Sequence, residues 1–167
     1  VLSLIKNRNP QSPIGVIGFS LGGNLALKML TEDSSLIEAA AVVSPPIDLY
    51  SCVREIQKPN AWLYQKNFMR KMRELLTIKE GQFRPLALDV EAAFKATNLF
   101  DFDDVITAPL HGFEGAKEYY TRCSTKNKLT EIDRPTCFIS SYDDPVLGDG
   151  CYPSPEEGSE QISLHLT

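Results

Sequence analysis

The chain has 167 residues, of which 43% are hydrophobic and 23% are charged, and its formal net charge is −5. One hydrophobic core normally serves on the order of 100–200 residues, so this length predicts a single domain or part of one. The composition excludes a disordered chain, and the acidic balance disfavours a nucleic-acid partner, which needs clustered cations to contact phosphates. No apolar run approaches the roughly 18 residues that span a bilayer.

The four cysteines form no C-x-x-C pair and have no histidines at metal-ligand spacing. No metal and no cofactor is therefore predicted, and reduced thiols in a cytoplasmic protein are the default expectation. Because the chain starts with Val1 rather than Met, we expect that a segment before it is missing, and that segment could carry a targeting signal.

Helix and strand patterns alternate in the first 45 residues. The expected elements are a helix over 1–8, a strand over 13–19, a helix over 21–30 and a strand over 38–44. In the second helix, Leu21, Leu25 and residues 27–30 are expected to form the buried face. The strand-helix-strand order predicts a parallel sheet covered by helices, and hence an α/β fold.

The segment from about 48 to 124 differs in character, because it has several helical patterns and few strand-like runs. Its longest helix is expected over 62–78, with an apolar side formed by Leu63, Phe68, Met72, Leu75 and Leu76. We interpret the segment as a helical insertion over the sheet. Strand patterns return over 136–141 and 162–166, so four neighbouring parallel strands are expected in all.

Residues 18–22, GFSLG, fit the G-x-S-x-G pattern of a nucleophile elbow, and they stand between an expected strand and an expected helix. Ser20 is the predicted nucleophile, and the Leu21 N–H at the start of the helix is a predicted oxyanion-hole donor. Both motif glycines are expected because side chains there would collide with the neighbouring chain, and Gly23 is expected to let the helix pack closely on the sheet. An ordinary glycine-rich turn is the alternative.

A serine nucleophile needs a histidine base and an acid that orients the histidine, and in this motif class the chain order is serine, acid, histidine. The predicted acid lies in the run Tyr142-Asp143-Asp144-Pro145, directly after an expected strand. Asp144 is the first choice and Asp143 is the reserve. A surface turn capped by aspartate is the alternative interpretation.

Only two histidines are present, and neither is well placed for catalysis. His111 precedes the acid in a loop that enters a helix, so a structural or substrate-lining role is favoured. His165 follows the acid but lies within the last expected strand, on the face opposite Ile162, Leu164 and Leu166. A histidine in the middle of a strand is not expected to reach a serine at the end of another strand.

Three segments together resemble the YheT-like branch of the α/β-hydrolases, a group of predicted esterases and lipases that includes acylglycerol and phospholipid hydrolases. They are GVIGFSLGGNLALKML over 15–30, FDFDDVITAPLHGFEGAKEYY over 100–120 and YDDP over 142–145. The resemblance implies an α/β-hydrolase fold and a Ser-Asp-His triad whose histidine lies in a Gly-Gly-His loop directly after the final strand. We therefore expect residues 1–167 to be a partial domain, without the N-terminal strands and the C-terminal histidine loop, and to be inactive alone.

The predicted function is hydrolysis of a carboxylic ester of a lipid or medium-chain acyl group. Ser20 would attack the carbonyl carbon, the Leu21 N–H would stabilise the oxyanion, and water would release the acyl group. The helical insertion is expected to supply an apolar acyl pocket. Two alternatives stay open: an acyltransferase on the same scaffold, in which an alcohol replaces water, and a non-catalytic remnant that binds a ligand or partner.

Two charged clusters have alternative interpretations. Asp101, Asp103 and Asp104 could suggest a cation site, but they lack further oxygen ligands at loop spacing, so a capped helix entry is favoured. The other cluster consists of four cations of the longest expected helix: Lys66, Arg70, Lys71 and Arg73. These cations could contact anionic lipid headgroups in a peripheral membrane contact, although a solvated helix face is the commoner explanation.

Overall fold

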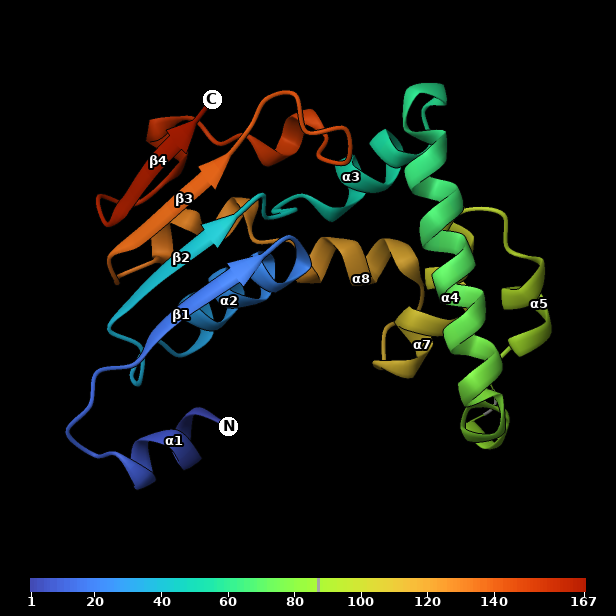
Figure 1. Ribbon diagram of the computed structural model, residues 1–167, viewed down its shortest axis with the longest axis horizontal. Helices are drawn as coiled ribbons and strands as arrows, with labels where there is room; N and C mark the ends of the chain where they lie inside the picture. Colours follow the sequence, from blue (N-terminus) through green and yellow to red (C-terminus); the bar gives the residue numbers. More distant parts are fainter. Residues whose placement is uncertain (87) are drawn as a thin grey trace. The chain divides into compact units, whose positions relative to one another are not determined.

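The computed structural model describes residues 1–86 and 88–167. The chain divides into two compact units, one formed by residues 1–48 and 124–167 and the other by residues 49–123 (Figure 1). None of the described helices combines the length and the apolar character that crossing a membrane requires.

The first unit is built on a four-stranded parallel sheet in the order β1-β2-β3-β4 (Figure 1). Its strands are β1 (Gly15–Phe19), β2 (Ala39–Val43), β3 (Thr136–Ser140) and β4 (Ile162–Leu166). The expectation of four neighbouring parallel strands is confirmed. All four strands point the same way, so their carboxyl ends lie at one edge of the sheet.

Two α-helices belong to the first unit, α1 (Leu2–Arg8) and α2 (Leu21–Glu32). Short 3₁₀ turns complete it: η4 (Lys126–Glu131), η5 (Asp149–Cys151) and η6 (Pro155–Glu157). The expected buried face of α2 is partly wrong, because Leu21 and Leu25 are 47% and 54% exposed whereas Leu27 and Leu30 are buried. Gly23 faces the sheet, and at about 100° per residue Leu21 and Leu25 fall on the opposite side of the helix from Gly23, Leu27 and Leu30.

The two faces of the sheet differ in what covers them within the first unit. On the face against α2, Val42 and Phe138 are fully buried. On the other face, Ile17, Phe19 and Ile139 are 70%, 67% and 40% exposed, and Figure 1 shows no helix of this unit over them. Parallel sheets normally bury both faces, so an apolar sheet face is left open in this unit.

The second unit consists of helices and turns, and none of its described residues forms a strand. Its elements are α3 (Leu49–Ile56), η1 (Pro59–Ala61), α4 (Trp62–Phe83), η2 (Arg84–Leu86), α5 (Val90–Lys95), α6 (Leu99–Phe102), the π-turn η3 (Asp103–Thr107), α7 (Ala108–Leu110) and α8 (Ala116–Cys123). Its larger core cluster joins Met69 and Leu76 of α4 to Val90, Ala93, Phe102 and Ile106.

The expected apolar side of the long helix is also partly wrong. Helix α4 has 22 residues and buries Met69 and Leu76. Leu63 and Leu75, which were expected on the same apolar side, are 59% and 44% exposed. The helix has apolar residues around much of its circumference, so only its contacts select the buried side.

The acids near residue 103 bind separate partners. Asp103 accepts hydrogen bonds of 2.6 Å from the hydroxyls of Thr107 and Tyr120, and burial raises the pKa of its carboxyl group. Asp104 accepts a 2.8 Å hydrogen bond from the Ala116 N–H, and Asp101 pairs with Asn98, the N-cap of α6. These bonds tie η3 to α8.

Replacing Ile17 with Thr should reduce self-association of the chain, because this change removes apolar surface from the open sheet face and keeps a β-branched side chain in the strand. The free energy of unfolding should change by less than about 0.5 kcal/mol. Sedimentation velocity and chemical denaturation measure the two quantities.

The matched control is Val42→Thr on the buried face, which should cost about 1–2 kcal/mol of stability because it buries a hydroxyl. Equal effects of the two substitutions on stability would show that the two faces are covered alike.

Candidate active site

Ser20 occupies the sharp turn between β1 and α2. Its backbone has φ 50° and ψ −127°, a conformation that residues other than glycine rarely adopt. The turn is held because the Ser20 N–H donates a 2.8 Å hydrogen bond to the Val43 carbonyl at the end of β2. Ser20 is exposed. A strained backbone held by its surroundings is typical of functional positions.

The glycines of this turn have different reasons to be glycine. A Cβ atom on Gly18 would lie 2.4 Å from the Gly22 carbonyl oxygen and 2.6 Å from the Gly23 Cα atom, so no side chain fits there. A Cβ atom on Gly23 would lie 3.0 Å from Pro45, which agrees with close packing of the helix on the sheet. The expectation of a collision at Gly22 is wrong, because nothing lies within 4 Å of the corresponding position.

The start of α2 presents backbone donors beside Ser20. The Ser20 carbonyl accepts hydrogen bonds from the N–H groups of Gly23 and Asn24, at 2.8 and 3.2 Å. Leu21 is the first residue of the helix, where the N–H group has no intrahelical acceptor and the helix dipole is positive. Its role as an oxyanion-hole donor stays a prediction with favourable local geometry.

A buried hydrogen bond anchors this helix start and was missed by sequence reasoning. The Thr125 hydroxyl donates to the Asn24 side-chain oxygen over 2.7 Å, and both residues are at most 1% exposed. The Thr125 N–H in turn donates to the Ile47 carbonyl. The polar Asn24 in a helix with a buried face was the available signal, but its partner lies 101 residues away in the chain.

The acid candidates lie in the loop after β3. Asp144 is half-buried, and its Oδ1 accepts a 2.9 Å hydrogen bond from the Val146 N–H. Asp143 is exposed, and its Oδ1 accepts a 2.6 Å hydrogen bond from the Ser141 hydroxyl. The fixed and less exposed carboxylate of Asp144 is better suited to orient a histidine, although the choice between the two stays a prediction.

Sheet topology relates this loop to Ser20. β1 and β3 are separated by β2, so their carboxyl ends are roughly 10 Å apart at about 4.8 Å per strand. That separation leaves room for a histidine ring between a serine and a carboxylate at the same edge.

His165, the histidine of the first unit, does not supply that ring. His165 lies in β4, in register with Ile139, and its Nε2 is 3.1 Å from the Ser163 hydroxyl. β4 is three strands from β1, or roughly 14 Å, whereas a general base must approach within about 3 Å of its proton donor. His111 follows α7 in the second unit and is exposed.

The described part of the chain has no cluster of side chains placed to bind a metal and no disulfide. Within residues 1–86 and 88–167, no group of three or more His, Cys, Asp or Glu side chains is placed to hold a metal ion. The cysteines at 52, 123, 137 and 151 form no disulfide among the described residues, and Cys52 and Cys151 are buried.

Substituting Gly18 with Ala should destabilise the protein by about 3 kcal/mol, because the new methyl group meets backbone atoms that cannot move without displacing α2. Gly22→Ala, four residues later, should change stability by no more than about 1 kcal/mol, toward stabilisation, since the space is open and alanine favours helix. Thermal unfolding of both variants checks this difference. Similar losses from the two substitutions would contradict the close contact at Gly18.

Comparison with known proteins supplies relatives that are similar in sequence over most of this chain. "Putative esterase YheT" of Escherichia coli is 30% identical over 159 residues, which cover 93% of this chain and 47% of that protein. "Monoacylglycerol lipase ABHD2" of Danio rerio is 29% identical over 158 residues, covering 88% and 37%. "Medium-chain fatty acid ethyl ester synthase/esterase 2" of Saccharomyces cerevisiae is 32% identical over 171 residues, covering 86% and 37%. The chain thus spans less than half the length of these relatives.

The fold and the family agree. The structure of an alpha/beta fold family hydrolase from Bacillus anthracis matches 99% of this chain and 63% of its own length, with a TM-score of 0.56 and 15% sequence identity. The family model described as alpha/beta hydrolase fold matches residues 1–154. The chain therefore belongs to the alpha/beta hydrolase fold family.

Proposed function

We propose that this chain carries the nucleophile and the acid of a serine hydrolase that cleaves carboxylic esters of lipids or medium-chain acyl groups. The observation that carries the proposal is the strained backbone of exposed Ser20 between β1 and α2. The names of the relatives, an esterase, a monoacylglycerol lipase and an ester synthase/esterase, support the ester class.

In the proposed reaction, the Ser20 Oγ atom attacks the ester carbonyl carbon while a histidine takes the hydroxyl proton. The carbonyl oxygen becomes an oxyanion that accepts a hydrogen bond from the Leu21 N–H. Collapse of this intermediate breaks the carbon–oxygen bond to the alcohol, which leaves with the proton from the histidine. Water then attacks the acyl-serine by the same route and releases the carboxylic acid.

The histidine is proposed to lie in sequence that follows Thr167. The Thr167 carbonyl accepts hydrogen bonds from the Tyr142 N–H at 2.8 Å and from the Ser141 hydroxyl at 3.0 Å. A residue shortly after Thr167 would therefore lie beside the loop that carries Asp144. This placement supports a base next to the acid, which the position of His165 in β4 does not.

Acyl transfer to an alcohol is the second candidate, and the name of the yeast relative, a synthase/esterase, favours it. The two reactions share the acyl-serine and differ only in the second nucleophile. Product analysis in water containing ethanol separates them, because a transferase makes ethyl ester in excess of the ratio set by the two nucleophile concentrations. The third candidate is a non-catalytic binding protein. The position of His165 favours this candidate, because β4 is too far from β1 for His165 to act as the base.

Extending the chain beyond both ends should yield a protein whose Ser20 is labelled by a fluorophosphonate, because such probes react with activated serines. Its Ser20→Ala variant and the 167-residue chain should remain unlabelled, since loss of one triad member lowers the rate by about 10⁴–10⁶-fold. Gel fluorescence measures the labelling. Strong labelling of the 167-residue chain would show that His111 or His165 acts as the base.

Within the extended protein, Asp144→Asn should lower kcat for a p-nitrophenyl ester by about 10⁴-fold, because an amide favours the wrong histidine tautomer. The matched variant Asp143→Asn should change kcat by less than about tenfold, as its carboxylate is bound to Ser141. Steady-state kinetics of both variants decide the assignment. The reverse order of effects moves the acid to Asp143.

A further inference from the structure

Helix α4 presents apolar side chains on two sides. Met69 and Leu76 are buried against the core of the second unit. Tyr64, Leu75 and Ile78 are 44%, 44% and 79% exposed. At 3.6 residues per turn these three residues fall within about 60° of one another, on the side opposite Met69 and Leu76. We call this exposed stripe, with Lys71 in its middle, the outer face of α4.

Apolar exposure continues at both ends of the helix. Leu86, in η2 just after its end, is 56% exposed. Trp62 and Leu63, at its start, are each 59% exposed, although by the helical repeat they lie on other sides of α4 than the outer face. Single exposed apolar residues are ordinary on protein surfaces, but a concentration along one helix marks an interaction surface. Tryptophan and tyrosine are also the side chains that favour the boundary between lipid and water.

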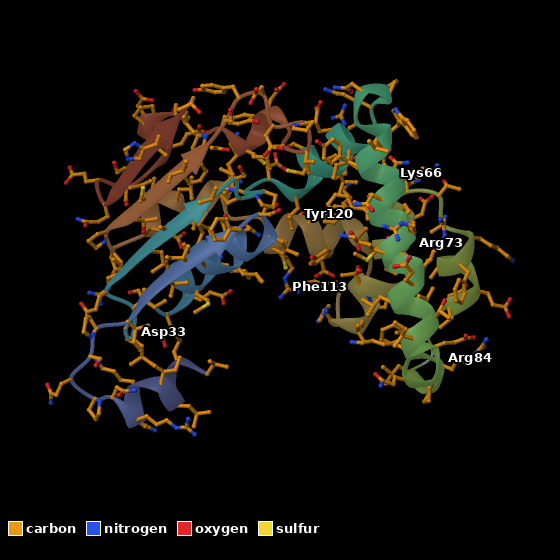
Figure 2. All side chains as sticks on the ribbon, in the orientation of Figure 1. Asp33, Lys66, Arg73, Arg84, Phe113 and Tyr120 are labelled. Atoms are coloured by element: carbon orange, nitrogen blue, oxygen red, sulfur yellow. The ribbon has the colours of Figure 1, made fainter. Side chains whose placement is uncertain are left out.

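The same segment is strongly cationic in an acidic chain. Residues 62–86 hold six cations against two acids, Glu74 and Glu80, which makes a net charge of +4 when the whole chain carries −5. Figure 2 shows three of the cations, Lys66, Arg73 and Arg84, spaced along α4 and the turn that follows it. The remaining 142 residues therefore carry −9, so the positive charge is concentrated on this element. By the helical repeat, Lys66, Arg70 and Arg73 fall on the side away from the outer face, and the cations on or beside that face are Lys71 and Lys79.

Both acids of the segment are already neutralised. Glu74 pairs with Arg70 at 2.8 Å, and Glu80 pairs with Arg84. Lys66 lies 5.8 Å from the centre of the Trp62 ring, over its face. In the described part of the chain, Lys71 and Lys79 make no ion pair, and both are exposed. Their long apolar stems can lie along the outer face while their ammonium groups extend to phosphates.

We propose that the outer face of α4 docks on the surface of an anionic lipid bilayer. The helix would lie in the plane of the interface, with Tyr64, Leu75 and Ile78 at the acyl boundary and Lys71 and Lys79 among the headgroup phosphates. A nucleic acid would match the cations but leave the apolar stripe exposed to water. An acidic protein surface would match the cations equally, and the experiment below separates it from lipid. The docking is independent of catalysis and would bring a lipid ester close to the enzyme.

Trp62 is the only tryptophan of the chain, but at about 100° per residue it falls on the Met69 side of α4. The probe is therefore a variant in which Trp62→Phe and Tyr64→Trp together move the tryptophan to the outer face. Adding phosphatidylcholine vesicles with roughly one third phosphatidylglycerol, which gives the vesicles a negative surface potential, should shift the tryptophan emission of this variant to shorter wavelength. Lipids brominated near the headgroup should quench this emission more than lipids brominated at the chain end, because the helix lies at the interface. Pure phosphatidylcholine vesicles should have a much weaker effect, and added salt should reverse the shift.

Two pairs of substitutions test whether the cations and the apolar side chains of the outer face bind the bilayer, and a third pair is the control. Lys71→Gln with Lys79→Gln should weaken partitioning to anionic vesicles by about 30-fold. Leu75→Asn with Ile78→Asn should weaken it by at least about tenfold. Lys95→Gln with Lys117→Gln removes two exposed cations from α5 and α8 and should change partitioning by less than about threefold. Circular dichroism checks that each variant retains its helices.

Several results would overturn the proposal. One is an unchanged tryptophan emission of the probe variant with anionic vesicles, which is also the result expected if the outer face binds a protein instead. Another is that neutral and anionic vesicles shift the emission equally, or that all three pairs of substitutions weaken partitioning equally. Adsorption would then occur through another surface, such as the open sheet face. Should one of these substituted chains fail to fold, bromolipid quenching of the probe variant without further substitutions still decides, since absence of quenching contradicts docking through the outer face.

Discussion

The close contact between β1 and α2 is the constraint on which the site depends. Gly18 and Gly23 allow the strand end and the helix start to approach without a side chain between them. The chain then has only one residue in which to reverse direction, and Ser20 takes a positive φ that a hydrogen bond to Val43 holds in place. The exposure of Ser20 and the position of the Leu21 N–H at the helix start follow from this geometry.

The parallel register of the sheet gives that turn its surroundings. Because every strand runs in the same direction, the serine turn after β1 and the acidic loop after β3 meet at one edge. The last strand, β4, returns the end of the chain to that edge, where Thr167 bonds to Ser141 and Tyr142. His165 is exposed on the same strand, three strands from β1, which explains why it is poorly placed to take the proton of Ser20.

The apolar surfaces of the two units differ in chemistry. The open face of the sheet, with Ile17, Phe19 and Ile139, consists largely of aliphatic and aromatic groups and resembles the interior of a protein. The outer face of α4 interleaves apolar and cationic side chains, which suits a boundary between lipid and water. Both surfaces are apolar, so the cationic side chains are what distinguishes the outer face of α4 from the open face of the sheet.

Local sequence determined the four strands, the helices α1, α2 and α4 and the serine turn, because each depends on residues close together in the chain: a β-branched run, a helical repeat of apolar residues, or a glycine-serine-glycine pattern with a helix directly after it. Only the tertiary structure decided which leucines of α2 and α4 are buried, since both helices have apolar residues on more than one side. It also decided that space is open at Gly22 and that Asn24 bonds to Thr125. Those outcomes depend on how each helix is rotated against its neighbours and on contacts between distant segments, which no local pattern encodes.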